Sequence, residues 1–136
     1  MSESNKQLVR RWFEEVWNQR REATIDELLS PECRVYGLSG DELMVGPEGF
    51  KIFHRSFCSA FPDLKIVVHD MITEGDKIAI RWEATMTHLG DGLGFPASGK
   101  KANLDGTTIA VIKNGRIDEG WNHMDMGGLF AELRTP

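Results

Sequence analysis

The N-terminal part of the chain carries apolar residues at helical spacing. This spacing predicts a helix over residues 5–19 with one broad apolar face. A short second helix is expected from Thr24 to Leu29, because Pro31 prevents it from continuing. A third helix is predicted over residues 48–60. The apolar stripes of the first and third helices contain Leu8, Val9, Trp12, Phe13, Val16 and Trp17, and Phe50, Phe53 and Phe57.

Elsewhere the pattern is typical of strands, in which side chains alternate between two faces. Strands are predicted over residues 32–37, 64–73, 77–88, 101–113 and 116–125. Asn114-Gly115 is a strong hairpin signal between the last two strands, because both residues tolerate positive φ. A short final helix is expected after Gly127-Gly128, where the sequence becomes apolar again.

The order of these elements, with helices first and an antiparallel meander after them, predicts an α+β fold. We expect one domain over residues 1–136, since a chain of this length is most simply a single domain. The helices need a partner for their apolar faces, and one face of the sheet can cover them. A sheet curled around the helices forms a cone with an apolar interior, which is a common kind of ligand site.

Composition and charge narrow the classes of partner. The chain is 40% hydrophobic and 27% charged, as is usual for a globular domain. Its net charge of −5, without a basic stripe, disfavours nucleic acid. No apolar run approaches the ~18 residues of a membrane span, and no apolar signal segment is found at the N-terminus. We expect a cytoplasmic protein in which Cys33 and Cys58 are reduced, buried thiols, with one disulfide as the alternative.

The most unusual chemistry lies in residues 118–125. If this segment is a strand, alternate residues share one face. These residues are Glu119, Trp121, His123 and Asp125. Carboxylates and an imidazole are costly to bury unless they are paired or neutralised. The face therefore either points into water or lines a cavity that needs proton-transfer groups, and the predicted cone favours the cavity.

Short motifs occur in a characteristic order along nearly the whole chain. They are Val9-Arg-Arg-Trp-Phe-Glu-Glu-Val-Trp-Asn18, Val45-Gly-Pro-Glu-Gly-Phe50, Phe61-Pro-Asp-Leu64, Ile80-Arg-Trp-Glu-Ala-Thr-Met-Thr-His88, Asn114-Gly-Arg-Ile117, Glu119-x-Trp121 and Asp125 ahead of Gly128-Leu-Phe. In this order they resemble the SnoaL-like polyketide and ester cyclases of the nuclear-transport-factor-2-like (NTF2-like) superfamily. The resemblance implies a cone in which a curved antiparallel or mixed sheet wraps around N-terminal helices. It also implies a homodimer that forms through the outer face of the sheet.

The resemblance further implies acid–base chemistry without a cofactor or a metal, on a small apolar keto or ester compound. The reaction would be an intramolecular aldol-type cyclisation or an isomerisation, as in a lyase or isomerase. Family cyclases use an Asp near the end of the last strand and a His two residues before it, and these positions carry Asp125 and His123. Family cyclases also place a His on the preceding strand. Here that strand offers only Asn103, Asp105, Thr107 and Thr108 as polar groups.

Seven further residues are expected to line the cone and contact the substrate. They are Trp121, Glu119, Arg81, Trp17, Phe13, Phe53 and Phe57. Glu119 has a second interpretation as a surface carboxylate, or as an ion-pair partner of Arg81 or Arg116. His88 is expected to hold the loop over residues 89–100, which would form a rim or lid.

Alternatives remain for the site and for the function. Asp125 could cap the final helix instead of transferring protons, or do both. A non-catalytic small-molecule-binding domain would use the same cone. Water addition, as in the epoxide hydrolases of the superfamily, would need a carboxylate and an arginine, for which Asp125 and Arg81 are the candidates.

Overall fold

The computed structural model describes residues 2–39 and 42–135 and has an α+β architecture. Its helices are α1 (Ser2–Arg11), the π-helix η1 (Trp12–Asn18), α2 (Glu22–Leu28), α3 (Gly46–Ala60) and α4 (Met126–Arg134). Its strands are β1 (Leu29–Ser39), β2 (Glu42–Val45), β3 (Lys65–Glu74), β4 (Lys77–Thr87), β5 (Lys101–Lys113) and β6 (Arg116–Met124). None of the helices within this part of the chain is long and apolar enough to cross a membrane.

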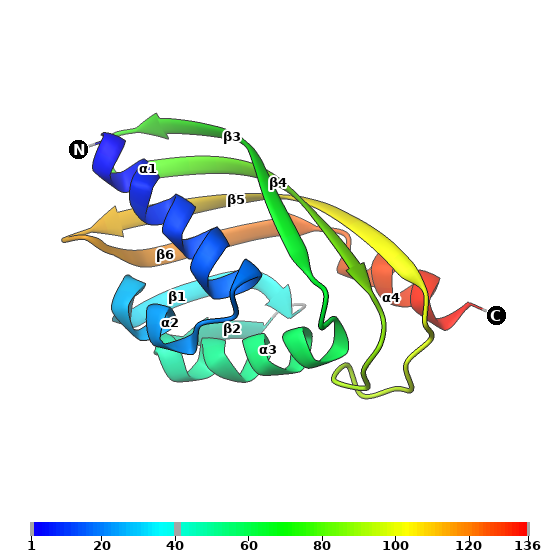
Figure 1. Ribbon diagram of the computed structural model, residues 1–136. Coiled ribbons are helices and arrows are strands. Elements are labelled where there is room, and N and C mark those ends of the chain that lie inside the picture. The colour runs from blue at the N-terminus through cyan, green and yellow to red at the C-terminus, as the bar shows by residue number, and fades with distance from the viewer. Residues whose placement is uncertain (1, 40–41, 136) are drawn as a thin grey trace.

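The strands form one mixed sheet in the order β2-β1-β6-β5-β4-β3. All neighbours are antiparallel except β1 and β6, which run parallel. The sheet curves, and α1, α2 and α3 lie on one of its faces, while α4 follows β6 (Figure 1). The predicted α+β fold, with a curved sheet around N-terminal helices, is therefore confirmed. The sequence pattern had not indicated β2 or the parallel pairing of β1 with β6.

The first helix differs from the prediction in its start and in its winding. It begins at Ser2 rather than at residue 5, and its last seven residues form a π-helix. The wider winding is seen where the backbone N–H of Gln19 donates to the carbonyl of Glu14, five residues earlier, at 2.8 Å. In a π-helix, residues five apart lie on about the same side of the helix, so Trp12 and Trp17 both face the sheet.

Asn18, the last residue of η1, fastens the helix to the edge of the sheet. Its Oδ1 accepts a hydrogen bond from the backbone N–H of Ile66 at 2.7 Å, and its Nδ2 donates to the carbonyl of Ile66 at 2.9 Å. Since β3 is an edge strand, this side chain supplies the partners that a neighbouring strand would supply. The position of η1 over the sheet is thereby fixed.

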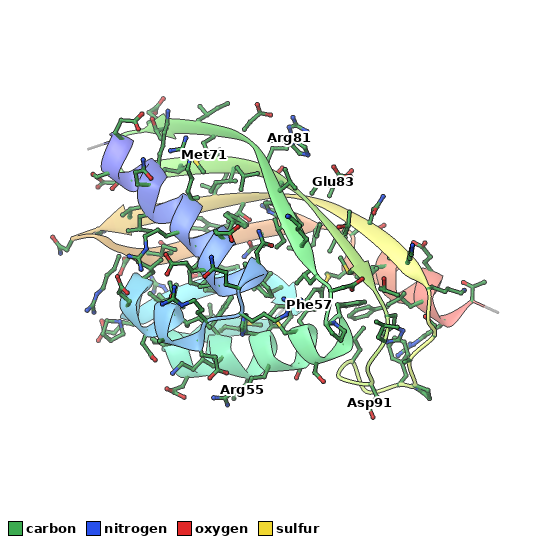
Figure 2. The ribbon with its side chains drawn as sticks, viewed as in Figure 1. Arg55, Phe57, Met71, Arg81, Glu83 and Asp91 are labelled. Carbon is green, nitrogen blue, oxygen red and sulfur yellow. The ribbon has the colours of Figure 1, made fainter. Side chains whose placement is uncertain are left out.

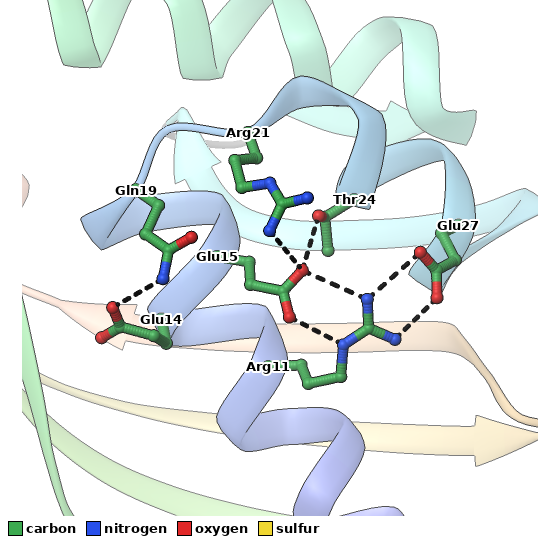
Figure 3. Close-up of polar contacts among 7 residues, drawn as sticks. All are labelled: Arg11, Glu14, Glu15, Gln19, Arg21, Thr24 and Glu27. Carbon is green, nitrogen blue, oxygen red and sulfur yellow. Dashed lines mark hydrogen bonds and ion pairs between the residues drawn. The ribbon is translucent and has the colours of Figure 1, made fainter.

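An ion-pair network joins the first helix to α2 (Figure 3). The Arg11 guanidinium donates to the carboxylates of Glu15 and Glu27, and Glu15 also accepts from the Thr24 hydroxyl at 2.9 Å. Arg21 completes the network, with its guanidinium 3.6 Å from Glu15. Hydrogen bonds from Arg11 lower the pKa of Glu15 to about 2, so this carboxylate stays charged.

The hairpin predicted at Asn114-Gly115 is confirmed, with φ values of 53° and 73°. Just beyond it, the pairing of β5 with β6 is irregular. Ile117 pairs with Ile112 and Glu119 pairs with Val111, so Asp118 is an extra residue in β6. Such a bulge reverses which alternate residues of the following strand face the helices.

His88 holds the following loop, as expected. Its Nδ1 accepts from the backbone N–H of Ser98 at 3.0 Å, and its carbonyl accepts from Gly99 at 2.8 Å. The loop is also attached to the end of α3, because the N–H groups of Leu89 and Gly90 both donate to the carbonyl of Ala60. The loop over residues 89–100 therefore has a defined position beside α3.

The cysteines do not form a disulfide. Cys33 is fully buried and Cys58 is partly buried, and both are free thiols. Burial raises the pKa of each thiol, so both are kept in the neutral form.

Candidate functional site

A cavity of about 80 Å³ lies between the concave face of the sheet and the helices η1 and α3. Its lining is dominated by aromatic and aliphatic side chains, and none of the described residues that line it is ionisable. Seven aromatic residues form much of the wall. They are Trp12, Phe13 and Trp17 from η1, Phe50, Phe53 and Phe57 from α3, and Trp82 from β4.

Four of the predicted substrate-binding residues are where the sequence placed them. Phe13, Trp17, Phe53 and Phe57 all line the cavity. In Figure 2, Phe57 lies between α3 and the sheet. Their contact with a substrate stays a prediction.

Trp82, Thr108 and Asn122 line this apolar cavity and are joined by hydrogen bonds. The indole Nε1–H of Trp82 donates to the Thr108 hydroxyl at 3.0 Å, and that hydroxyl donates to Oδ1 of Asn122 at 2.8 Å. The Nδ2 group of Asn122 then donates to the carbonyl of Tyr36 in β1 at 3.0 Å. The second amide hydrogen of Asn122 has no acceptor among the residues that the structure describes. Because Asn122 lines the cavity, its amide group is the candidate donor to a ligand.

Two glycines make this arrangement possible. A Cβ at Gly106 would lie 2.3 Å from the Trp82 ring, so only glycine leaves room for the indole to lie over β5 and reach Thr108. A Cβ at Gly37 would lie 2.0 Å from the carbonyl oxygen of Asn122, and Gly37 also has φ +87°. Gly37 therefore lets β1 approach β6 closely at Asn122.

The prediction that Glu119, Trp121 and His123 line the cavity is wrong. The residues of β6 that line it are Ile117, Gly120, Asn122 and Met124. The alternation is as expected, but the extra residue at the bulge shifts its phase, so the even-numbered residues after the bulge face inward. The predicted polar face of β6 therefore lies on the outer side of the sheet.

The outer residues have partners of their own. Glu119 lies 3.6 Å from the Arg34 guanidinium and 3.4 Å from the Tyr36 hydroxyl, rather than beside Arg81 or Arg116. Trp121 stacks on Tyr36, with ring centroids 5.8 Å apart and planes inclined by 10°. Glu119 and Trp121 thus belong to a surface cluster on β1 and β6.

Arg81, predicted to line the cone, points away from the helices (Figure 2). Its Nε donates to the Asp70 carboxylate on β3 at 2.6 Å. Among the described residues, no contact joins Arg81 to Asp125, so the pair needed for water addition is not assembled.

Asp125 caps the final helix, which confirms that interpretation of the sequence. Its Oδ1 accepts a hydrogen bond from the backbone N–H of Gly128 at 2.8 Å, at the start of α4. Asp125 and His123 are both exposed. Their neighbours Met124 and Met126 line the cavity, so Asp125 lies beside the site without facing it. Its catalytic role stays a prediction.

Sequence reasoning did not identify Trp82, Thr108 and Asn122 as the polar site. Thr108 was noted only as one of several polar residues on its strand, because the inward face of β5 could not be chosen without the sheet. A second signal was present in Gly106, since glycine in a strand often marks a close approach by another group.

An open groove on the outside of η1 adjoins the cavity. Its polar lining includes Lys6, Arg10 and Asp70, and it shares Phe13 and Ile66 with the cavity. These two side chains form the wall between the charged groove and the apolar interior. The described part of the chain contains no group of three or more His, Cys, Asp or Glu side chains that could hold a metal ion.

His54 is buried next to the cavity wall and takes no part in its lining. Its Nε2 lies 2.7 Å from the carbonyl of Val16 in η1, and its ring packs against Trp17 with centroids 5.0 Å apart. Burial lowers the pKa of His54 below its ordinary value, so the neutral imidazole is favoured. This histidine supports the wall by joining α3 to η1.

Comparisons of the sequence and of the structure with known proteins both lead to polyketide cyclases. The SnoaL-like polyketide cyclase family matches residues 7–133 of the chain. No curated protein sequence matches it. Among solved structures, TsrD from Streptomyces laurentii is 28% identical, with a TM-score of 0.84, over 98% of this chain and 97% of that one. A candidate polyketide cyclase from Acidithiobacillus ferrooxidans is 25% identical, with a TM-score of 0.80, over 96% and 94% of the two chains.

A further structure is similar in fold. It is a candidate SnoaL-like polyketide cyclase from Jannaschia sp. CCS1, with 24% identity and a TM-score of 0.89, covering 98% of this chain and 93% of that one. At this identity the likeness shows the NTF2-like fold alone.

Proposed function

Because this chain belongs to the SnoaL-like polyketide cyclase family, we propose that it binds a small, largely apolar keto or ester compound in its cavity. The observation that carries the proposal is the lining, which is apolar apart from the group formed by Trp82, Thr108 and Asn122. Apolar walls with a few convergent polar groups are typical of small-molecule sites.

Asn122 is the proposed anchor for the carbonyl oxygen of the ligand. Its Oδ1 is held by Thr108 and one of its amide hydrogens by the carbonyl of Tyr36, so the orientation of the amide is fixed. The remaining amide hydrogen can donate to an acceptor in the cavity. An amide donor held in this way would also stabilise negative charge that develops on a carbonyl oxygen.

The test compares cyclohexanone with methylenecyclohexane, which has the same shape without the oxygen. The quantity compared is the ratio of the ketone affinity to the alkene affinity, because only the ketone loses hydrogen bonds to water on entering the cavity. A net hydrogen bond of about 0.5–1.5 kcal/mol from Asn122 makes this ratio roughly two- to tenfold higher than it is without the donor. Asn122→Leu should lower the ratio by this factor, while the same substitution at exposed Asn103 of β5 should leave it unchanged. Affinities measured by NMR titration give the ratio within each variant, so a change in overall stability cancels. An equal preference in wild type and Asn122→Leu would contradict the anchor.

Catalysis by Asp125 and His123 is the second candidate function, and family membership favours it. The proposed reaction is a cofactor-independent aldol-type cyclisation or isomerisation in which Asp125 takes up and returns a proton. For this, its carboxylate would have to leave the Gly128 amide and reach the cavity past Met124 or Met126. Binding without turnover needs no such movement.

Asp125→Asn separates the two candidates. Asparagine keeps an acceptor for the helix cap and removes the titrating carboxylate, so the fold is preserved. Loss of turnover with unchanged ligand affinity would support catalysis by Asp125. Turnover equal to that of the wild type would exclude it.

We also propose that two copies associate through the outer face of the sheet, as the family resemblance implies. The half-exposed stack of Tyr36 and Trp121 on this face supports the proposal. Light scattering should give a dimer mass for the wild type and a monomer mass for Trp121→Arg. A monomer mass for the wild type at all concentrations would contradict it.

A further inference from the structure

The groove outside the cavity lies between the first helix and the free edge of β3. Its volume is about 370 Å³, within the range of roughly 300–1,000 Å³ that is typical of ligand sites. We propose that this groove binds an extended acidic peptide segment of a partner protein, which adds to β3 as a further strand. Binding at this surface would be independent of the proposed function, since the groove is separate from the apolar cavity.

The edge of β3 presents backbone groups that β4 does not pair. The N–H and carbonyl of Ile66 point away from β4, because both are hydrogen-bonded to the Asn18 side chain, at 2.7 and 2.9 Å. In an antiparallel ladder every second residue points the same way, and the pairing with β4 is regular from Lys65 to Val68. The N–H and carbonyl of Val68, which lines the groove, therefore also face the open edge. An added strand would give both groups a partner.

The two walls of the groove run in opposite directions. Figure 1 shows that α1 begins near the C-terminal end of β3 and runs back along it. Asn18 and Ile66 lie together at one end of the groove, so Lys6 and Arg10 line the other end, toward Met71. A strand placed beside Val68 would continue directly under these two cations.

Lys6 and Arg10 select for an acidic partner. Neither forms an ion pair with any residue that the structure describes, whereas the adjacent Arg11 pairs with both Glu15 and Glu27. The two cations are one helical turn apart, or about 6 Å along the axis, and two residues of a strand span about 6.6 Å. Carboxylates at alternate positions of an added strand would therefore reach both cations.

The acidic side chains of the groove already have partners. The Asp70 carboxylate accepts from Nε of Arg81 at 2.6 Å. The Glu14 carboxylate accepts from the side-chain amides of Asn18 and Gln19, at the far end from Lys6. The charge left without a partner in the groove is therefore positive.

Three end-capped pentapeptides provide the test in ¹⁵N–¹H NMR titrations. They are Thr-Glu-Thr-Glu-Thr, its isomer Thr-Glu-Glu-Thr-Thr, and Thr-Lys-Thr-Lys-Thr. The first peptide has both carboxylates on one face of the strand, whereas its isomer has them on opposite faces. Since the isomer can form only one of the two ion pairs, it should bind about two- to fivefold more weakly. The lysine peptide should not bind, and the first peptide should shift the amide signal of Val68.

Variants of the protein test the two walls separately. Lys6→Glu combined with Arg10→Glu should weaken binding of the first peptide about tenfold, because each attraction becomes a repulsion. The control is Lys101→Glu with Lys113→Glu, at the exposed ends of β5, which changes the net charge equally and should have no effect. Val68→Pro removes the edge N–H, as proline on an edge strand can, and should abolish binding, whereas Val68→Ala should not.

Each contrary outcome has a distinct meaning. Equal affinity for the two glutamate peptides would overturn pairing as a strand, and this comparison decides the point even if Val68→Pro does not fold. Undiminished binding to the variant with both Lys6→Glu and Arg10→Glu would overturn the groove as the site. A short oligothymidylate that displaces the first peptide and binds more tightly would overturn a peptide as the partner. A dimer mass in light scattering that this double variant lowers would assign the groove to a second copy instead. If no peptide binds, the inference fails while ligand binding in the cavity is unaffected.

Discussion

Replacing Thr108 by valine should reveal how much the hydrogen bonds of Thr108 with Trp82 and Asn122 contribute to stability. The substitution keeps the shape and the β-branched character of the side chain but removes its hydroxyl. The Nε1–H of Trp82 then loses its acceptor and the Oδ1 of Asn122 loses its donor. Thr107→Val, one residue earlier on the exposed face of β5, is the matched control.

The magnitude follows from the burial of the groups left unpaired. Trp82 is only 6% exposed, so its indole N–H cannot turn to water. Leaving one buried group without a partner costs about 1–3 kcal/mol, and we expect the free energy of unfolding to fall by this amount. Thr107→Val should change it by less than about 0.5 kcal/mol, because its side chain is exposed.

A double-mutant cycle with Trp82→Phe isolates the coupling. Phenylalanine has no N–H to leave unpaired, so Thr108→Val should cost less in that background, by about 0.5–2 kcal/mol. Urea unfolding followed by far-UV circular dichroism gives all four free energies. Equal costs of Thr108→Val in both backgrounds would refute the hydrogen-bonded arrangement.

Three further predictions concern packing and pH. Gly106→Ala should lower the free energy of unfolding by about 1–3 kcal/mol in urea titrations, because the added Cβ would overlap the Trp82 ring. Gly49→Ala in α3 should instead raise it by about 0.5–1 kcal/mol, because a Cβ there has no neighbour within 4 Å and alanine favours the helix. Because the pKa of Glu15 is lowered from 4.5 to about 2, its charged form stabilises the fold above pH 4.5, and this contribution is lost as the pH falls toward 2. Glu15→Gln should therefore show a smaller decrease in unfolding free energy over that range, and an unchanged decrease would argue against the Arg11 network. Burial lowers the pKa of His54, so its NMR titration should lie below its ordinary value of 6.5. The unfolded chain then takes up the proton first, and stability should fall as the pH drops from above 6.5 toward the lower midpoint of the folded protein. A midpoint at or above 6.5 would contradict its burial as a neutral ring.

Most of the elements could be predicted because their signals are local. The helical spacing of residues 48–60 and the turn at Asn114-Gly115 are encoded in short stretches of sequence. The π-helical winding of η1 had no such local signal, and η1 makes contacts with residues far away in the chain. Its Asn18 and Val16 bond to Ile66 and His54, which no local pattern could have indicated.

The location of the site was harder to predict than the fold. Helical residues such as Phe13 and Phe57 were placed correctly, since a helix buries one contiguous stripe. The inward face of β6 was placed wrongly, because one extra residue at Asp118 exchanges the two faces of the strand. A bulge of this kind depends on the pairing with β5 and leaves no clear mark in the sequence of β6 alone.

The four tryptophans give the most direct test of the central claim, that the apolar cavity and not the outer polar face binds the ligand. Trp12, Trp17 and Trp82 line the cavity, and Trp121 lies on the opposite side of the sheet. In a ¹⁵N–¹H NMR spectrum, each gives a separate indole signal, which a Trp→Phe variant assigns. Addition of cyclohexanone should shift the signals of the three cavity tryptophans and leave that of Trp121 in place. A shift confined to Trp121 would contradict this claim and indicate that the ligand binds on the outer face of the sheet.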